Sequence, residues 1–177
     1  TNVVKGLKVN PGSWATGGNL NTARNNGGLA GCGSQTAALA FGGYDPTGIT
    51  EKYNGTSWTE VNDMNTGRGY LAGAGTQTAA LAFGGAGAPG SNVAATETWN
   101  GTNWTAVNDM QNARQKLAGA GTNTAALVFG GSSAQALTET WNGTNWTEVN
   151  DLSTGRRFLA GSGTNTAALA FGGGPGN

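Results

Sequence analysis

The chain contains no histidine and a single cysteine, Cys32. A disulfide within the chain is therefore excluded, and zinc, copper and haem sites lose their commonest ligand. Charged residues make up only 10% of the 177 residues, and nine basic side chains balance nine acidic ones. Because such a chain has little attraction for a polyanion, we expect no nucleic-acid binding. No apolar run approaches the roughly 20 residues of a membrane span, so we expect no membrane insertion.

What the sequence has instead is a repeat. The segment Thr-Ala-Ala-Leu-Ala-Phe-Gly-Gly occurs four times, once with Val for Ala, at intervals of 42 to 46 residues. The 33 glycines and low charge would usually indicate disorder, but six tryptophans and five phenylalanines supply the apolar area that a folded core needs. A period of this length indicates one supersecondary unit that buries its apolar face only by stacking on copies of itself.

Each unit contains two expected hairpins. A small-residue segment such as 71–76 precedes the repeated Ala-Leu-Ala-Phe segment, and glycine at alternate positions favours strands over a helix. Further along, Asn-Gly lies between two aromatic, threonine-rich runs, as in residues 96–105, which predicts a tight hairpin with a type I′ turn. Each unit is thus predicted to be a sheet of four short antiparallel strands. Two tight hairpins per unit favour a propeller blade over a rung of a β-solenoid.

The repeat predicts an all-β fold, a single four-bladed β-propeller over residues 1–177. Three blades are expected at about 29–61, 71–107 and 117–149. The fourth begins at about 158–173 and lacks its second hairpin. Residues 9–14 align with residues 53–58, so residues 3–16 are expected to supply the missing two strands. This closure would pair the first strands of the chain with the last and leave no open end.

These features resemble kelch repeats. The resemblance rests on an apolar strand ending in Gly-Gly, then two aromatic residues such as Trp99 and Trp104, then an arginine such as Arg114 before the next inner strand. It covers nearly the whole chain. The sequence departs from the family in having four units rather than six or seven, and in having Val9 and Asn19 where the other units have an aromatic residue and an aspartate.

Enzymatic activity is not expected. The kelch-related galactose oxidases need histidine ligands for copper, and sialidase-like propellers carry Ser-x-Asp-x-Gly-x-Thr-Trp boxes; neither is present. The acids and arginines recur in every unit, which favours a structural network over one asymmetric catalytic set. The paired tryptophans favour packing between blades over sugar stacking, and Cys32 aligns with Ala74, Ala120 and Ser162, which indicates a small packing residue. No cofactor or metal site is expected.

The units differ mainly after the arginine and after the Gly-Gly pair, and in a propeller both sets of loops lie on one face. Loops on a rigid scaffold commonly carry binding groups, although neutral drift explains the same variability. The candidate ligand-binding residues on this face are Arg24, Asn25, Asn26, Tyr44, Asp45, Arg68, Tyr70, Arg114, Gln115, Lys116, Arg156, Arg157 and Phe158.

The sequence therefore favours a non-enzymatic binding or display module that presents this face to a cell-surface glycan or protein. The alternative is a structural subunit that packs against neighbouring subunits of a capsid, tail or filament. Low charge and richness in glycine, threonine, asparagine and alanine resemble extracellular and virion proteins such as phage fibres and decoration proteins, which implies an extracellular or virion-surface location.

Overall fold

The computed structural model describes residues 17–24, 28–43, 45 and 47–175, and within these ranges the regular structure is β, apart from one short 3-10 turn, η1 (Ser132–Ala134). No helix in the described part of the chain is long and apolar enough to cross a membrane. The strands are β1 (Ala30–Ser34), β2 (Ala37–Phe41), β3 (Thr50–Tyr53), β4 (Trp58–Val61), β5 (Ala72–Gly75), β6 (Ala80–Phe83), β7 (Thr96–Trp99), β8 (Trp104–Val107), β9 (Ala118–Gly121), β10 (Ala126–Phe129), β11 (Thr138–Trp141), β12 (Trp146–Val149), β13 (Arg157–Gly163) and β14 (Ala168–Gly174).

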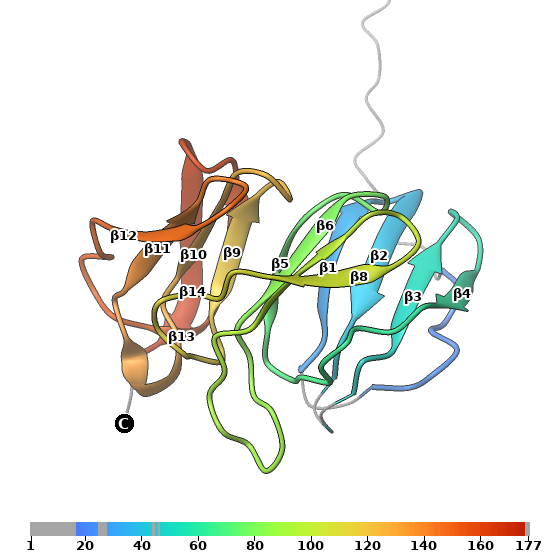
Figure 1. Cartoon of the computed structure of the whole chain (residues 1–177), viewed down its shortest axis with the longest axis horizontal. Coiled ribbons are helices and arrows are strands. Elements are labelled where there is room, and N and C mark those ends of the chain that lie inside the picture. The colour runs from blue at the N-terminus through green and yellow to red at the C-terminus, as the bar shows by residue number, and fades with distance from the viewer. Residues whose placement is uncertain (1–16, 25–27, 44, 46, 176–177) are drawn as a thin grey trace, which may run out of the picture.

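The strands form one antiparallel sheet per repeat. Three sheets have four strands in chain order, β1-β2-β3-β4, β5-β6-β7-β8 and β9-β10-β11-β12, and the last has the two strands β13 and β14. The expected all-β class and the four-stranded repeating unit are thereby confirmed. In Figure 1, β1–β4 and β9–β12 lie at opposite sides, with strands of the second sheet between them.

The outer hairpins differ from the expected type I′ turn. Trp99 pairs directly with Trp104, so four residues rather than two form the loop. Only its glycine, Gly101, has a positive φ, of 95°. The asparagine instead accepts hydrogen bonds through Oδ1 from the backbone N–H groups of Thr102 and Asn103, at 2.9 and 2.8 Å. The predicted type I′ turn is wrong because the asparagine side chain accepts hydrogen bonds from the loop backbone and so stabilises a four-residue loop.

Phenylalanine and tryptophan hold successive sheets together. The Phe83 ring lies edge-on to Trp146 of the next sheet with centroids 5.1 Å apart, and Trp146 Nε1 donates to Thr96 Oγ1 at 3.0 Å. The tip of the same ring lies against Gly119: an added Cβ there would be 2.4 Å from Phe83 Cζ. The preceding pair of sheets repeats the arrangement with Phe41 and Trp104. These contacts support the packing role expected for the tryptophans.

The first and last sheets lack this contact in the described structure. Phe171, the counterpart of Phe83, is 51% exposed, and Leu169 is 70% exposed, whereas Phe83 is fully buried. Gly31, the counterpart of Gly119, has no phenyl ring near its Cβ position. The predicted pairing of residues 3–16 with the last sheet lies outside the described residues. Closure of the four units into a ring therefore stays a prediction.

Candidate functional site

Three of the repeated arginines lie inside the protein. Each connects the segment that precedes a four-stranded sheet to the third strand of that sheet. Arg114 Nη2 contacts Glu139 Oε1 at 3.0 Å, and the side chains of both residues are fully buried. Arg114 Nη1 also donates to the carbonyls of Gly130, at 3.2 Å, and Leu137. Equivalent ion pairs join Arg68 to Glu97 and Arg24 to Glu51. The structural network favoured by the repetition of these charges is present in three units.

Burial and pairing act on these arginines in opposite directions. Burial lowers the pKa of Arg114 from its usual value, and the negative charge of Glu139 raises it. For Arg68, burial again lowers the pKa and Glu97 opposes the change. A guanidinium with such a high intrinsic pKa stays charged at neutral pH. Arg68 and Arg114 are therefore buried cations whose Nη groups bond internally and whose buried Nε–H groups have no partner among the described residues, and neither offers its side chain to a ligand on the surface.

Arg156 differs from its three counterparts. Its Nη1 donates to the Gly172 carbonyl at 2.8 Å, and no carboxylate among the described residues pairs with it. The side chain is half-buried. The fourth unit thus repeats the cation without repeating its acid.

The second residue after each of Arg68, Arg114 and Arg156 belongs to one connected group on the loop face. Tyr70, Lys116 and Phe158 have φ values of 52°, 60° and 55°, a left-handed conformation that non-glycine residues rarely adopt. Backbone hydrogen bonds connect them in series: Tyr70 N–H donates to Gly28, Lys116 N–H to Tyr70 and Phe158 N–H to Lys116, each at 2.9 Å. Backbone strain of this kind often accompanies a functional site.

These three side chains form one aromatic and cationic cluster. Lys116 Nζ lies 5.4 Å from the centroid of the Tyr70 ring and 5.1 Å from that of Phe158. The two rings meet edge to face at 5.9 Å. Phe158 is 56% exposed, so one large apolar ring faces solvent beside a cation. A hollow of about 240 Å³ at the cluster is lined also by the leucine of every unit: Leu29, Leu71, Leu117 and Leu159.

A second hollow continues from this cluster. Its volume is about 460 Å³, and it shares Tyr70 and Lys116 with the first. Its other wall is the loop between β6 and β7, including Ala88 and Pro89, which projects from the sheets in Figure 1. Gln115 holds this loop, because its Nε2 donates to the Gly90 carbonyl at 3.1 Å and to Asn92 Oδ1 at 3.0 Å. These two hydrogen bonds connect the loop between β6 and β7 to the segment that precedes β9.

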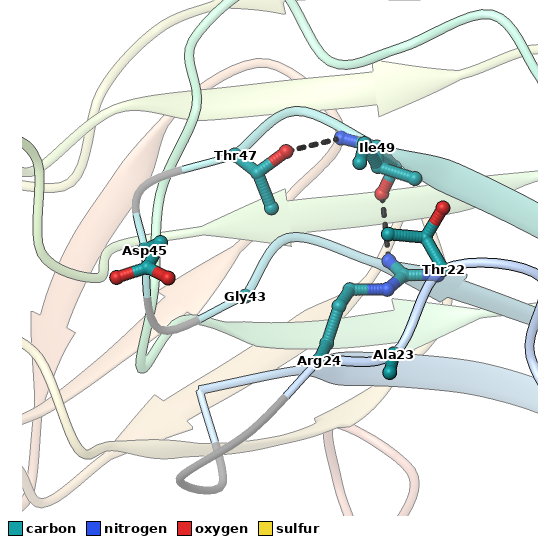
Figure 2. Close-up of a pocket in the computed structure, with 7 residues that line it drawn as sticks. All are labelled: Thr22, Ala23, Arg24, Gly43, Asp45, Thr47 and Ile49. Carbon is teal, nitrogen blue, oxygen red and sulfur yellow. Dashed lines mark hydrogen bonds between the residues drawn. The ribbon is translucent and has the colours of Figure 1, made fainter.

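The third hollow adjoins the second at Asp45, which lines both. Figure 2 shows Arg24 among the residues that line it, donating to the Ile49 carbonyl, and Thr47 Oγ1 accepting a hydrogen bond from Ile49 N–H. The arginine is used within the protein, whereas Asp45 is exposed. Together the three hollows form what we call the loop-face groove, lined along its length by Asp45, Pro89, Gln115, Lys116, Tyr70 and Phe158.

The structure brings together six of the candidate residues and separates others. The groove is lined by Arg24, Asp45, Tyr70, Gln115, Lys116 and Phe158. Arg157 lies beside it, with its guanidinium carbon 5.9 Å from the Phe158 centroid. Arg68 and Arg114 are internal, Arg24 pairs with Glu51 at the wall of the third hollow, and Arg156 contacts Gly172. Asn25, Asn26 and Tyr44 lie outside the described residues. The sequence candidates did not include Ala88 and Pro89, which line the second hollow. The greater length of this loop relative to the other units could have indicated them.

Cys32 has no arrangement for catalysis. Burial raises the pKa of its thiol to about 12, and Sγ donates to the Thr76 carbonyl at 3.5 Å. At neutral pH the thiol is therefore protonated, and the nucleophilic thiolate is rare. No group of three or more acidic or cysteine side chains suited to a metal ion occurs within the residues that the structure describes. No family model matches the chain, and no curated protein shows significant similarity to it.

Proposed function

We propose that the chain is a non-enzymatic binding module that recognises a glycan through the loop-face groove. The observation that carries this proposal is the cluster of Tyr70, Lys116 and Phe158 on the loop face, where two aromatic rings and one ammonium group meet. Sugars present an apolar ring face and a rim of hydroxyl groups. Aromatic faces with adjacent polar groups match both parts.

The groove also supplies hydrogen-bonding groups along its length. The Gln115 amide oxygen and the Asp45 carboxylate lie on the same face as the aromatic cluster. The positions of the groove residues are fixed by sheet ends and by the backbone hydrogen bonds that connect Tyr70, Lys116 and Phe158. A site built on a rigid scaffold loses little conformational entropy on binding, which compensates for the small contact area of an oligosaccharide. We place the module on a secreted protein or virion appendage, on the resemblance of its composition.

The test is binding of the purified chain to an array of oligosaccharides, followed by titration calorimetry with the glycans that are retained. Tyr70→Ala and Phe158→Ala are each expected to weaken binding at least about tenfold, because each removes one aromatic face, worth on the order of 1 to 3 kcal/mol when stacked. Thr105→Ala, at an exposed position of β8, is the control and should leave the affinity unchanged. Retention of no glycan, or equal affinity for all variants, would contradict the proposal.

We also propose that the four units form a four-bladed propeller whose last sheet is completed by residues 3–16. The four leucines around one hollow and the serial hydrogen bonds from Gly28 to Phe158 support a common axis. In a closed ring Phe171 packs against the first sheet near Gly31, as Phe83 packs against Gly119. Closure removes the exposed sheet edge that would otherwise promote association.

Closure makes a specific prediction for Phe171. In a closed ring Phe171→Ala lowers the free energy of unfolding by about 3 kcal/mol or more, since a buried ring is lost. Urea unfolding at several protein concentrations measures the loss. A loss below about 1 kcal/mol would mean that the Phe171 ring is not buried against the first sheet, and it would contradict closure. A large loss whose size depends on protein concentration would mean that a second chain covers the face, which is the outcome expected for a structural subunit.

A further inference from the structure

Within the part of the chain that the structure describes, the outer edge of β14 lacks the neighbouring strand that the other three sheets have. In each complete sheet the second strand pairs on both sides, as β10 pairs with β9 and β11. Among the described residues, β14 pairs only with β13. The missing neighbour occupies the position that β3, β7 and β11 take elsewhere, and each of these strands carries a glutamate that enters the same internal site.

The glutamate site has the same donors in every complete unit. Glu97, opposite Ala82 on the neighbouring strand, accepts from the backbone N–H of Asn65 at 2.7 Å and of Thr66 at 3.3 Å. The Arg68 guanidinium is the third donor, at 3.0 Å. The corresponding donors around Glu139 have the same distances to within 0.1 Å. Each carboxylate is therefore held by two backbone amides and one cation, and Glu97 accepts a further hydrogen bond from Asn65 Nδ2 at 2.9 Å.

The fourth set of donors has no carboxylate. Arg156 stands where Arg68 and Arg114 stand, and the N–H groups of Ser153 and Thr154 correspond to those of Asn65 and Thr66. None of these three receives an acid within the described ranges. Alignment places Leu7 opposite Ala170, at the position of the glutamate, and residues 1–16 contain no acid at all. In the closed propeller proposed above, residues 3–16 would therefore bring no acid to Arg156.

We propose that the β14 edge accepts, in exchange for the amino-terminal residues, a strand of another polypeptide with the pattern Thr-Glu-x-aromatic. Its glutamate lies opposite Ala170 and enters the site of Arg156, Ser153 and Thr154. Its aromatic residue lies opposite Ala168, as Trp99 lies opposite Ala80. The main-chain hydrogen bonds of strand addition supply affinity, and the charge pair supplies register and selectivity.

A second anchor lies beside the same edge, at Thr138. In the complete units the second tryptophan of the outer hairpin donates to a threonine hydroxyl of the preceding sheet, Trp104 to Thr50 and Trp146 to Thr96. The next threonine in the series, Thr138, receives no tryptophan in the described structure; its hydroxyl donates to the Ala136 carbonyl at 3.4 Å. A partner strand that continues into a hairpin with a tryptophan five residues after the first reaches this hydroxyl in the place that the repeat alignment gives to Trp14.

The probe is a synthetic peptide with the sequence of residues 138–149, Thr-Glu-Thr-Trp-Asn-Gly-Thr-Asn-Trp-Thr-Glu-Val, labelled with a fluorophore and titrated with the full chain. We expect saturable binding by fluorescence anisotropy. The same peptide with glutamine for its first glutamate is expected to bind at least about tenfold more weakly, because a buried charge-assisted hydrogen bond is lost. The variant Arg156→Gln should bind both peptides equally and weakly.

Further variants distinguish this proposal from nonspecific peptide binding and from the glycan site. Arg157→Gln removes the same charge one residue away and should retain the preference for the glutamate peptide. Leu7→Glu gives the amino-terminal strand its own acid and should reduce peptide binding at least about tenfold by competition. Absence of peptide binding, or binding indifferent to both the glutamate and Arg156, would overturn the proposal. Phe158→Ala leaves peptide binding unchanged, so failure of either proposal is distinguishable from failure of the other.

Discussion

Replacing Arg114 with methionine is expected to lower the free energy of unfolding by about 3 to 5 kcal/mol. The substitution keeps most of the side-chain length but leaves the Glu139 carboxylate fully buried with no cation, and it leaves the Gly130 and Leu137 carbonyls without their shared donor. An uncompensated buried charge costs more than the intact pair contributes. Urea unfolding followed by tryptophan fluorescence measures the change.

The sequence provides a matched control for Arg114. Arg156→Met removes the same side chain from the unit in which the described residues supply no carboxylate, and it is expected to cost less than about 1 kcal/mol. The double substitution Arg114→Met with Glu139→Gln should recover part of the loss, since it removes the buried charge as well. Equal losses for Arg114→Met and Arg156→Met would show that the internal ion pair is not the source of the stability.

Phe83→Ala is expected to cost about 3 to 5 kcal/mol. The ring is fully buried between Trp146 and Gly119 of the next sheet, and the rigid backbone of two sheets cannot collapse into the cavity that its loss creates. Phe158→Ala removes a ring of the same size from an exposed position and should change stability by less than about 1 kcal/mol. Thermal and urea unfolding of both variants give the comparison.

Gly119 gives an independent check of the same contact. A methyl group there would lie 2.4 Å from Phe83 Cζ, so Gly119→Ala destabilises the protein that retains the ring. In the Phe83→Ala background the same substitution enters the vacated space and should be tolerated or mildly stabilising. Additive losses from the two substitutions would contradict the packing of Phe83 against this glycine.

Several elements of the fold could be predicted from local patterns. The repeated Ala-Leu-Ala-Phe segment forms β2, β6, β10 and the first part of β14, and the segment after it in each complete unit forms an outer hairpin. These predictions succeed because strand alternation and turn residues act over a few positions. The turn type failed for a local reason of another kind, since the side chain of Asn100 competes with the backbone for the hydrogen bonds of the loop.

The candidate site was predicted less completely. Variation between units pointed to Tyr70, Lys116 and Phe158, because substitutions in a repeat stand out against its constant positions. The candidates also included the arginines that precede the variable loops, and the structure pairs three of them internally with acids. A recurring cation looks the same in sequence whether its partner is an acid or a ligand. The left-handed backbone at Lys116 has no local signal, since the residue is neither glycine nor asparagine.

The sequence by itself determined the all-β class, the repeating four-stranded unit and the order of its strands, because these follow from side-chain alternation and from self-similarity along the chain. Only the tertiary structure decided which charges are internal and which rings are exposed. Burial depends on contacts between residues distant in the chain, such as Phe83 with Trp146 and Arg114 with Glu139, and the same residue in the last unit has a different environment. Identical segments differ in role because their neighbours differ.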